Sequence, residues 1–192
     1  MMADLEVYLD ALSSGDDARA ENAARQIAAQ GVAALPALQP LLADPRPDTR
    51  WWAVRSLAGL QGEEAVPHLV IALADPDPGI RQCAARGLHE RPDERAVPAL
   101  IAALQDSDSL VVRIAANALV ASGSMAVPPL LQVAQAGPQK SQLEAMRALA
   151  LIGDQRSIPF LFDALDSDSM LMEYWANEGL ERMGVGMVFY KP

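Results

Sequence analysis

The chain has 192 residues, of which 51% are hydrophobic, so it can bury a substantial core and is not expected to be disordered. Aromatic residues make up only 5%, and Ala, Leu and Val dominate the apolar positions, a composition that favours closely packed helices. The formal net charge of −10 argues against nucleic acid as a partner, because binding to phosphates depends mainly on Lys and Arg.

Residues 1–17 contain neither a basic segment nor a long apolar run, and no stretch of about 18 apolar residues follows them. We therefore expect a soluble, cytoplasmic protein with no membrane partner. The single cysteine, Cys83, has no second cysteine for a disulfide and no clustered histidines for a zinc site. We expect it to be a small helix residue, and we expect no metal and no cofactor.

The first predicted unit, residues 1–31, is a pair of helices that we interpret as the N-terminal capping repeat. Its apolar residues recur at helical spacing on two segments, Leu5, Leu9 and Leu12 followed by Ala23 and Ile27. This pattern is weaker than the one that follows it.

Five repeats then occupy residues 32–184. A proline recurs every 30 or 31 residues, at Pro36, Pro67, Pro98, Pro128 and Pro159. Proline suits the first turn of a helix, so each one marks the start of the first helix of a pair. Seventeen residues later comes an alanine with a leucine four positions further on, as in Ala53 and Leu57, which predicts the buried face of a second helix. We predict a single all-α domain over residues 1–192, a right-handed α-α superhelix of about six helical pairs, with residues 185–192 as a tail.

Acidic turns connect the two predicted helices of most repeats. Pairs of aspartates recur there, at Asp75/Asp77, Asp106/Asp108 and Asp166/Asp168, and the recurrence favours helix caps over metal ligands. Arg50 and Arg81 are expected to reach the turn aspartates of a neighbouring repeat. The fourth repeat differs, since Gln142 replaces that arginine. Glycines that end second helices in a left-handed conformation are predicted at Gly62, Gly123, Gly153 and Gly184.

Residues 65–88, AVPHLVIALADPDPGIRQCAARGL, and residues 96–119, AVPALIAALQDSDSLVVRIAANAL, resemble the HEAT-like repeats of the phycobilisome lyase class. The resemblance covers roughly residues 32–184 and implies an armadillo-like helical solenoid. It does not define a function, because this class includes bilin lyase subunits, deoxyhypusine hydroxylase, alkylpurine DNA glycosylases and many scaffolds.

No catalytic residue is expected. The hydroxylase resemblance implies His-Glu pairs at the start of the second helices, and this chain has other residues there, such as Trp51-Trp52 and Gln82-Cys83. The one His-Glu dipeptide, His89-Glu90, is interpreted as a solvated helix end, and His68 as a surface residue. Phosphate-binding and nucleophile motifs are also missing from the sequence.

The second helices of such repeats line a concave surface, where an extended partner usually lies. Positions fifteen and nineteen residues after each proline are neighbours one turn apart and should face it. We predict these partner contacts: Trp51, Arg55, Arg86, Arg113, Asn117, Arg147 and Tyr174. Trp52 and Trp175 lie next to core alanines and are set aside. The alternative is that the arginines pair with acidic residues of adjacent repeats.

The leading hypothesis is a non-enzymatic scaffold that binds an acidic or aromatic-bearing protein segment. A bilin lyase or pigment-protein chaperone is one alternative. A DNA glycosylase-like protein is the other, opposed by the acidic charge and by the lack of an aspartate beside Trp51 in the two groove rows. The apolar C-terminal segment, which includes Met187, Val188, Phe189 and Tyr190, either covers the last repeat or forms a homodimer contact.

Overall fold

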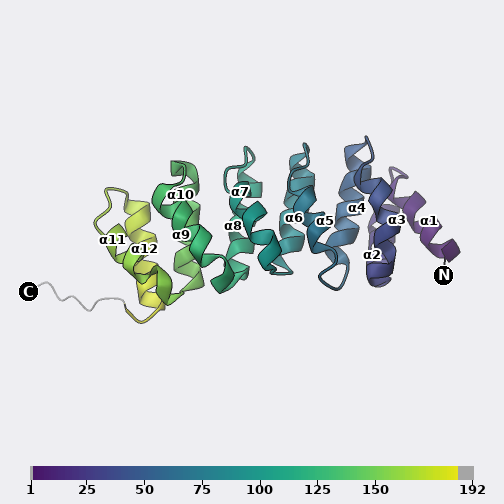
Figure 1. Ribbon diagram of the computed structural model, residues 1–192. Helices are drawn as coiled ribbons and strands as arrows, with labels where there is room; N and C mark the ends of the chain where they lie inside the picture. Colours follow the sequence, from purple (N-terminus) through teal and green to yellow (C-terminus); the bar gives the residue numbers. More distant parts are fainter. Residues whose placement is uncertain (1, 186–192) are drawn as a thin grey trace, which may run out of the picture. The chain divides into compact units, whose positions relative to one another are not determined.

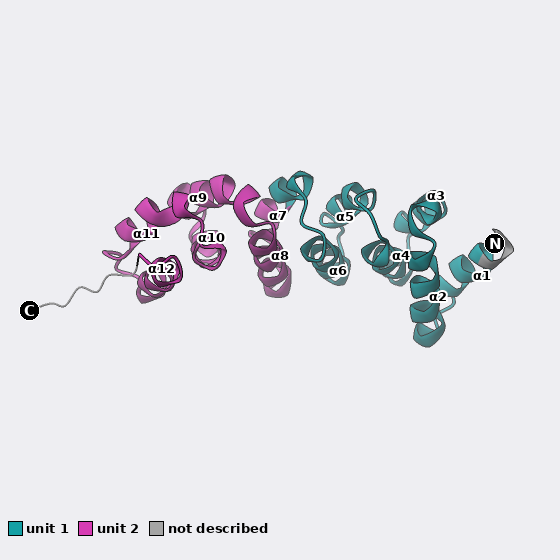
Figure 2. Cartoon of the chain, turned by 90° about the horizontal axis from the view of Figure 1, so that it is seen from below, with its two compact units in different colours: residues 1–99 teal, residues 100–192 magenta. Residues whose placement is uncertain are grey.

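The computed structural model describes the backbone of residues 2–185 and the side chains of residues 5–185. Residues 2–185 form twelve α-helices and four short 3-10 helices and contain no β-strand, which confirms the predicted all-α fold (Figure 1). The chain divides into two compact units, residues 1–99 and residues 100–192 (Figure 2). None of the described helices is long and apolar enough to cross a membrane.

The helices pair in chain order, and we call the first helix of a pair an A helix and the second a B helix. Unit 1 contains α1 (Met2–Leu12), α2 (Asp17–Ala29), α3 (Leu35–Leu42), α4 (Pro47–Gly59), α5 (Val66–Ala72) and α6 (Pro78–His89). Each A helix packs on the B helix that follows it, and the B helices pack on one another in the order α2, α4, α6. Figure 2 shows α3 and α5 on one side of this unit and α4 and α6 on the other.

Unit 2 has the same arrangement. Its helices are α7 (Val97–Ala103), which starts just before residue 100, then α8 (Ser109–Ala121), α9 (Val127–Ala136), α10 (Gln139–Ile152), α11 (Ile158–Ala164) and α12 (Met170–Arg182). The B helix α10 packs against both α8 and α12, while α9 packs on α10 and α11 packs on α12. The A helices α9 and α11 again lie together on one side (Figure 2).

The recurring prolines begin the A helices as predicted. In α3, α5, α9 and α11 the proline occupies one of the first two helical positions, where its missing N–H leaves no hydrogen bond unmade. Glycine also ends a B helix as predicted. Gly153 is the C-cap of α10 and has a φ of 67°, a left-handed conformation. Gly123 and Gly184 also have positive φ and directly follow the C-caps of α8 and α12, as predicted. The prediction for Gly62 was wrong, because α4 ends at Gly59 with Leu60 as its C-cap.

The core follows the predicted alanine and leucine positions. Ala53, Ala84, Ala115, Ala145 and Ala176 are all 0% exposed, and the leucine four residues after each is at most 2% exposed. Within each unit, the B helices that carry these side chains pack on the A helices and on neighbouring B helices. Burial of the aliphatic groups therefore stabilises both the pairs and their stacking.

Two of the predicted aspartate caps are confirmed, and one is wrong. Asp77 accepts hydrogen bonds from the backbone amides of Gly79 and Ile80, and Asp108 accepts equivalent bonds at the start of α8. Asp168 caps nothing, because α12 begins only at Met170, and its N-cap residue Ser169 makes no side-chain cap bond. The last turn has the same length as those before α6 and α8, but its aspartate lies one residue earlier, so the N-cap position falls on Ser169.

The fourth repeat lacks the arginine, and a lysine contacts the preceding turn instead. Lys140 Nζ donates to the carbonyl oxygen of Asp106 at 2.6 Å. The buried Ser141 hydroxyl donates to the carbonyl oxygen of Leu104 at 3.2 Å. These two bonds attach the start of α10 to the end of α7 and the turn after it.

Small residues allow consecutive B helices to approach closely. A Cβ atom added at Gly87 on α6 would lie 3.0 Å from the Cβ of Ala58 on α4. At Gly179 on α12 it would lie 2.9 Å from the Cα of Ala150 on α10. Glycine is therefore required at these contacts by packing and not by φ.

Candidate binding surface on the B helices

In unit 1, three of the predicted partner contacts lie on neighbouring B helices. Trp51 and Arg55 are one turn apart on α4, and Arg86 is on α6. Arg55 Nη2 donates to Glu21 Oε1 of α2 at 3.1 Å, so this guanidinium is held by the preceding repeat. The Arg86 side chain is 73% exposed, and its Nε lies 3.6 Å from Glu90 of the same helix.

In unit 2, the other four predicted contacts come from three B helices. Arg113 and Asn117 are exposed on α8. Arg147 on α10 donates to Glu144 at 2.9 Å and to the side-chain oxygen of Asn117 at 3.0 Å. Tyr174 on α12 is 56% exposed, and its ring meets that of Trp175 edge to face, with centroids 5.1 Å apart.

The predicted row of arginines therefore contains two kinds of side chain. Arg55 and Arg147 make hydrogen bonds to the preceding B helix, but only Arg55 pairs there with an acidic residue, as the alternative interpretation supposed. Within residues 5–185, neither Arg86 nor Arg113 forms an ion pair with a different helix. Within that part of the chain, these two guanidinium groups are not held by a neighbouring repeat, although Arg86 lies beside Glu90.

Arg50 occupies a structural position, as predicted. Its guanidinium bonds both oxygens of Asp75, at 2.8 and 3.0 Å, and also donates to the carbonyl of Asp44 at 2.9 Å. Burial alone would raise the pKa of Asp75, but the hydrogen bonds from Arg50 and from the Asp77 amide outweigh it and leave the pKa below its usual value. Arg81 makes the matching bond to the carbonyl of Asp75 in its own turn at 2.8 Å.

A hollow of about 460 Å³ lies at the N-terminal ends of α2 and α4. Its lining consists of Asp17, Asp48, Trp51 and Trp52. The two indole rings meet edge to face, with centroids 4.7 Å apart and planes at 89°. A second hollow of about 290 Å³, on the side of the α1–α2 turn, shares Asp17, Asp48 and Trp52.

This hollow adds to one expectation from the sequence and corrects another. Trp52 is half-buried beside a core alanine, as expected, and it also lines the same cavity as Trp51. Aspartates do lie beside Trp51, because the start of α2 brings Asp17 to the first turn of α4, where Asp48 is placed. The groove rows did not include either position, since both aspartates precede the periodic part of their helices.

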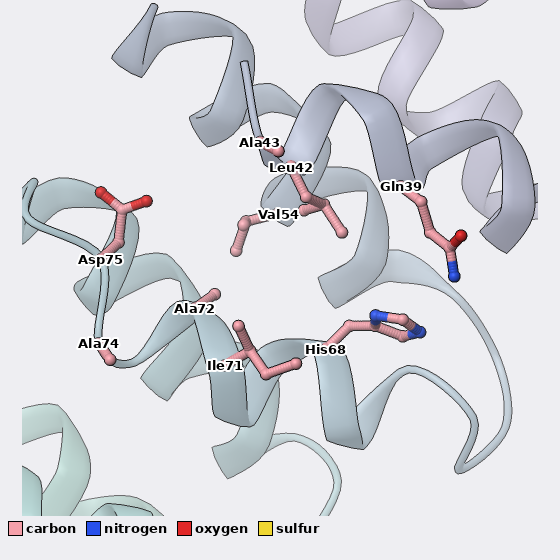
Figure 3. A pocket seen from close by; sticks show the side chains of 9 residues that line it. All are labelled: Gln39, Leu42, Ala43, Val54, His68, Ile71, Ala72, Ala74 and Asp75. Carbon is pink, nitrogen blue, oxygen red and sulfur yellow. The ribbon is translucent and has the colours of Figure 1, made fainter. Parts of the chain in front are cut away.

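The A-helix side of unit 1 carries a separate apolar groove of about 540 Å³ between α3 and α5 (Figure 3). Val54 lies between the two helices, and Ile71 on α5 is 72% exposed. His68 lines the groove and is half-buried. Asp75 at the other end already binds Arg50.

Groups suited to metal binding or nucleophilic catalysis do not cluster on this surface. No set of three or more His, Cys, Asp or Glu residues in the described part of the chain could hold a metal ion.

Burial raises the pKa of the Cys83 thiol to about 11, because it outweighs the charge of Arg55, which lowers this pKa. Cys83 is half-buried on α6, as expected of a helix residue, and its thiol is protonated at neutral pH. The predicted contacts Met187, Val188, Phe189 and Tyr190 lie outside the described residues.

Helix pairs repeated every 30 or 31 residues and stacked through their B helices define a helical-repeat protein. The chain belongs to the HEAT-repeat family, since the HEAT repeat family model matches residues 5–81 and 66–139. The model of the PBS lyase HEAT-like repeat matches residues 141–167, which confirms the resemblance noted from the sequence.

Solved structures with the same fold include natural and engineered repeat proteins. The complex of CpcE and CpcF of phycocyanin lyase from Nostoc sp. PCC7120 has a chain with 24% identity and a TM-score of 0.56, over 94% of this chain and 77% of that one. An engineered protein has 24% identity and a TM-score of 0.52, and the alignment covers 95% of this chain and 97% of that one. A designed armadillo repeat protein in complex with a (KR)4 peptide has 18% identity and a TM-score of 0.53, and the alignment covers 93% of this chain and 99% of that one. No curated protein matches the chain. These likenesses show the fold alone, which is a solenoid of helical repeats.

Proposed function

We propose that the protein is a non-enzymatic scaffold that binds an acidic or aromatic-bearing protein segment on the exposed face of its B helices. The observation that carries this proposal is the state of Tyr174. Its side chain is 56% exposed, yet its ring is braced edge to face by Trp175. An exposed aromatic ring that is already held in place loses little entropy on binding, which is typical of the anchor residues that dominate interfaces.

Arg86 and Arg113 are the groups that would select carboxylates or aromatic rings in the partner. Both are exposed on B helices, and neither is paired to a different helix among residues 5–185. A guanidinium group can bind a carboxylate through two parallel hydrogen bonds and can stack on an aromatic ring. Arg55 and Arg147 contribute less, because a partner would have to compete with Glu21 and Glu144.

Structural neighbours support a protein partner. The CpcE–CpcF structure is a complex of two proteins, and the designed armadillo repeat protein was solved in complex with a peptide. Within each unit, stacked helical pairs place similar positions side by side, and such a face suits an extended polypeptide.

A selection from a random peptide library, displayed on phage and applied to the immobilised full chain, tests the proposal. Recovered peptides, made synthetically, should be enriched in Asp, Glu and aromatic residues. Tyr174→Ala should weaken their binding about tenfold, the usual effect of losing an interface anchor. Arg113→Glu should weaken it about fivefold or more, because it replaces attraction to a carboxylate by repulsion.

Two variants serve as matched controls. Tyr174→Phe keeps the ring and should retain most of the affinity. Arg25→Glu reverses the charge of another exposed B-helix arginine, which pairs loosely with Glu21 at 3.8 Å and lies outside the predicted rows. Peptides whose affinity is unchanged by both Tyr174→Ala and Arg113→Glu, with the helical circular dichroism intact, would refute the proposal.

A further inference from the structure

The hollow between the first turns of α2 and α4 combines aromatic rings with free negative charge. Trp51 and Trp52 provide two ring systems set at 89° to each other, and Asp17 and Asp48 provide one carboxylate from each helix. At about 460 Å³ it is large enough for a side chain and its first contacts. The four residues therefore form one small site within unit 1.

The two carboxylates are not used by the fold. Asp16, and not Asp17, caps α2, since its side chain accepts from the amides of Ala18 and Arg19. Asp48 lies in the first turn of α4, whose N-cap makes no side-chain bond. Within the described part of the chain, neither Asp17 nor Asp48 makes a hydrogen bond or an ion pair. Their charge is available to a ligand.

No cationic side chain lines this hollow. Arg46 lines the smaller neighbouring hollow, but both oxygens of Asp44 hold its guanidinium at 3.0 Å. Arg55 on the same helix as the tryptophans is held by Glu21. Two carboxylates and two aromatic rings without an internal cation are complementary to a positively charged group.

We propose that this hollow binds an arginine side chain of a protein partner. A guanidinium group stacks on an indole ring and pairs with carboxylates, and it loses less hydration energy on burial than an ammonium group. The net charge of −10 favours the approach of a basic segment over long distances. This inference rests on the proposed role as a protein-binding scaffold and assigns to α2 and α4 a partner chemistry different from that of Arg86, Arg113 and Tyr174.

The experiment is a titration of the full chain, labelled with ¹⁵N, with a Gly/Ser peptide that carries a single arginine. The chain has three tryptophans, so three indole N–H signals report on binding, and Trp→Phe variants assign them. The signals of Trp51 and Trp52 should shift and that of Trp175 should not. The same peptide with citrulline, which has the shape of arginine without its charge, should bind about tenfold more weakly, because the cation–π and ionic contributions are lost.

A double variant, Asp17→Asn with Asp48→Asn, keeps the shape of the site and removes its charge. It should weaken the arginine peptide at least about fivefold, whereas Asp166→Asn with Asp168→Asn makes the same change in net charge elsewhere and should leave binding intact. Higher salt should weaken the wild-type complex in parallel.

Equal affinity for the citrulline and arginine peptides would overturn the proposal, as would shifts confined to Trp175 or no shift at millimolar peptide. Choline, added alone, tests whether the hollow binds a small quaternary ammonium compound instead. If choline bound as tightly as the arginine peptide, the assignment to a protein side chain would be overturned. Failure here would leave the Tyr174 and Arg113 variants of the peptide selection unaffected, so the two proposals fail separately.

Discussion

Arg50 and Asp75 join two successive repeats through a pair of parallel hydrogen bonds, Nε to Oδ2 at 2.8 Å and Nη2 to Oδ1 at 3.0 Å. Both side chains are largely buried, at 14% and 11% exposure. The same guanidinium also binds the carbonyl oxygens of Asp44 and Pro45 in its own turn. One side chain thus fixes the turn of its own repeat and the position of the next one.

Removing one partner of this pair should therefore destabilise unit 1. Asp75→Asn should lower the free energy of unfolding by about 2 kcal/mol, because the buried guanidinium loses its counter-charge. Urea denaturation of the single variants and of Arg50→Met with Asp75→Asn gives the coupling between them. The double variant should cost clearly less than the sum of the singles. Additive losses would mean that the pair does not join the repeats energetically.

The cap at Asp77 allows a comparison with Asp168, which lies one residue before the N-cap of the last B helix. Asp77→Ala should cost about 1 kcal/mol, since the amides of Gly79 and Ile80 lose their acceptor. Asp168→Ala should change stability very little, because this carboxylate caps no helix. Thermal unfolding followed at 222 nm, the wavelength of helical circular dichroism, measures both, and equal effects would contradict the assignment of the caps.

Gly179→Ala distinguishes packing from helix propensity. Alanine normally stabilises a helix interior by about 0.5–1 kcal/mol over glycine. Here the new Cβ would lie 2.9 Å from both the Cα of Ala150 and the Cδ1 of Leu161, and a backbone atom cannot move aside easily. We expect a net destabilisation of about 1–3 kcal/mol in urea denaturation, as for other overpacked contacts. Gly87→Ala, with distances of 3.0 Å to side-chain atoms, should be milder, and a stabilised Gly179→Ala protein would contradict the close contact of α10 and α12.

Acid should weaken the turns before it weakens the core. Hydrogen bonds from the side chains of Arg46 and Arg156 lower the pKa of Asp44 and of Asp154 from 3.8 to about 2. A carboxyl whose pKa is lower in the folded state contributes stability above pH 3.8, and this contribution disappears as the pH falls from about 4 to 2. The melting temperature of Asp44→Asn with Asp154→Asn should lie below that of the wild type at pH 5, and the two should converge near pH 2. A difference that stays constant over this range would show that the pairs do not titrate with folding.

The spacing of the prolines was enough to place the A helices, and the alanine–leucine pairs were enough to place the buried face of the B helices. Both depend on local periodicity, which stacking of equal repeats preserves. The Trp51–Trp52 hollow depends on the turn between α1 and α2, where the first repeat departs from the pattern. Asp17 could not be aligned with any later residue, and its approach to Asp48 was invisible in the sequence.

The pairing of the arginine row was equally hard to predict. Arg55 and Arg86 occupy the same repeat position, but only Arg55 has a glutamate, Glu21, within reach on the preceding B helix. The repeat position of an arginine specifies only where its Cα lies. Its partner depends on which residue the neighbouring repeat has there and on the rotamer of the arginine. The alternative stated from the sequence described Arg55 correctly, but it does not describe Arg147, whose acidic partner Glu144 lies on its own helix, or Arg113.

Site-specific photo-crosslinking tests most directly whether the B-helix face binds the partner. A benzophenone amino acid is placed at Tyr174 on a B helix or at Ile71, 72% exposed in the apolar groove on the A-helix side, and each protein is irradiated with the selected peptides. We predict a crosslinked product at position 174 that excess unlabelled peptide abolishes, and little product at position 71. Crosslinking confined to position 71 would contradict the proposal and would place the binding surface in the groove between α3 and α5.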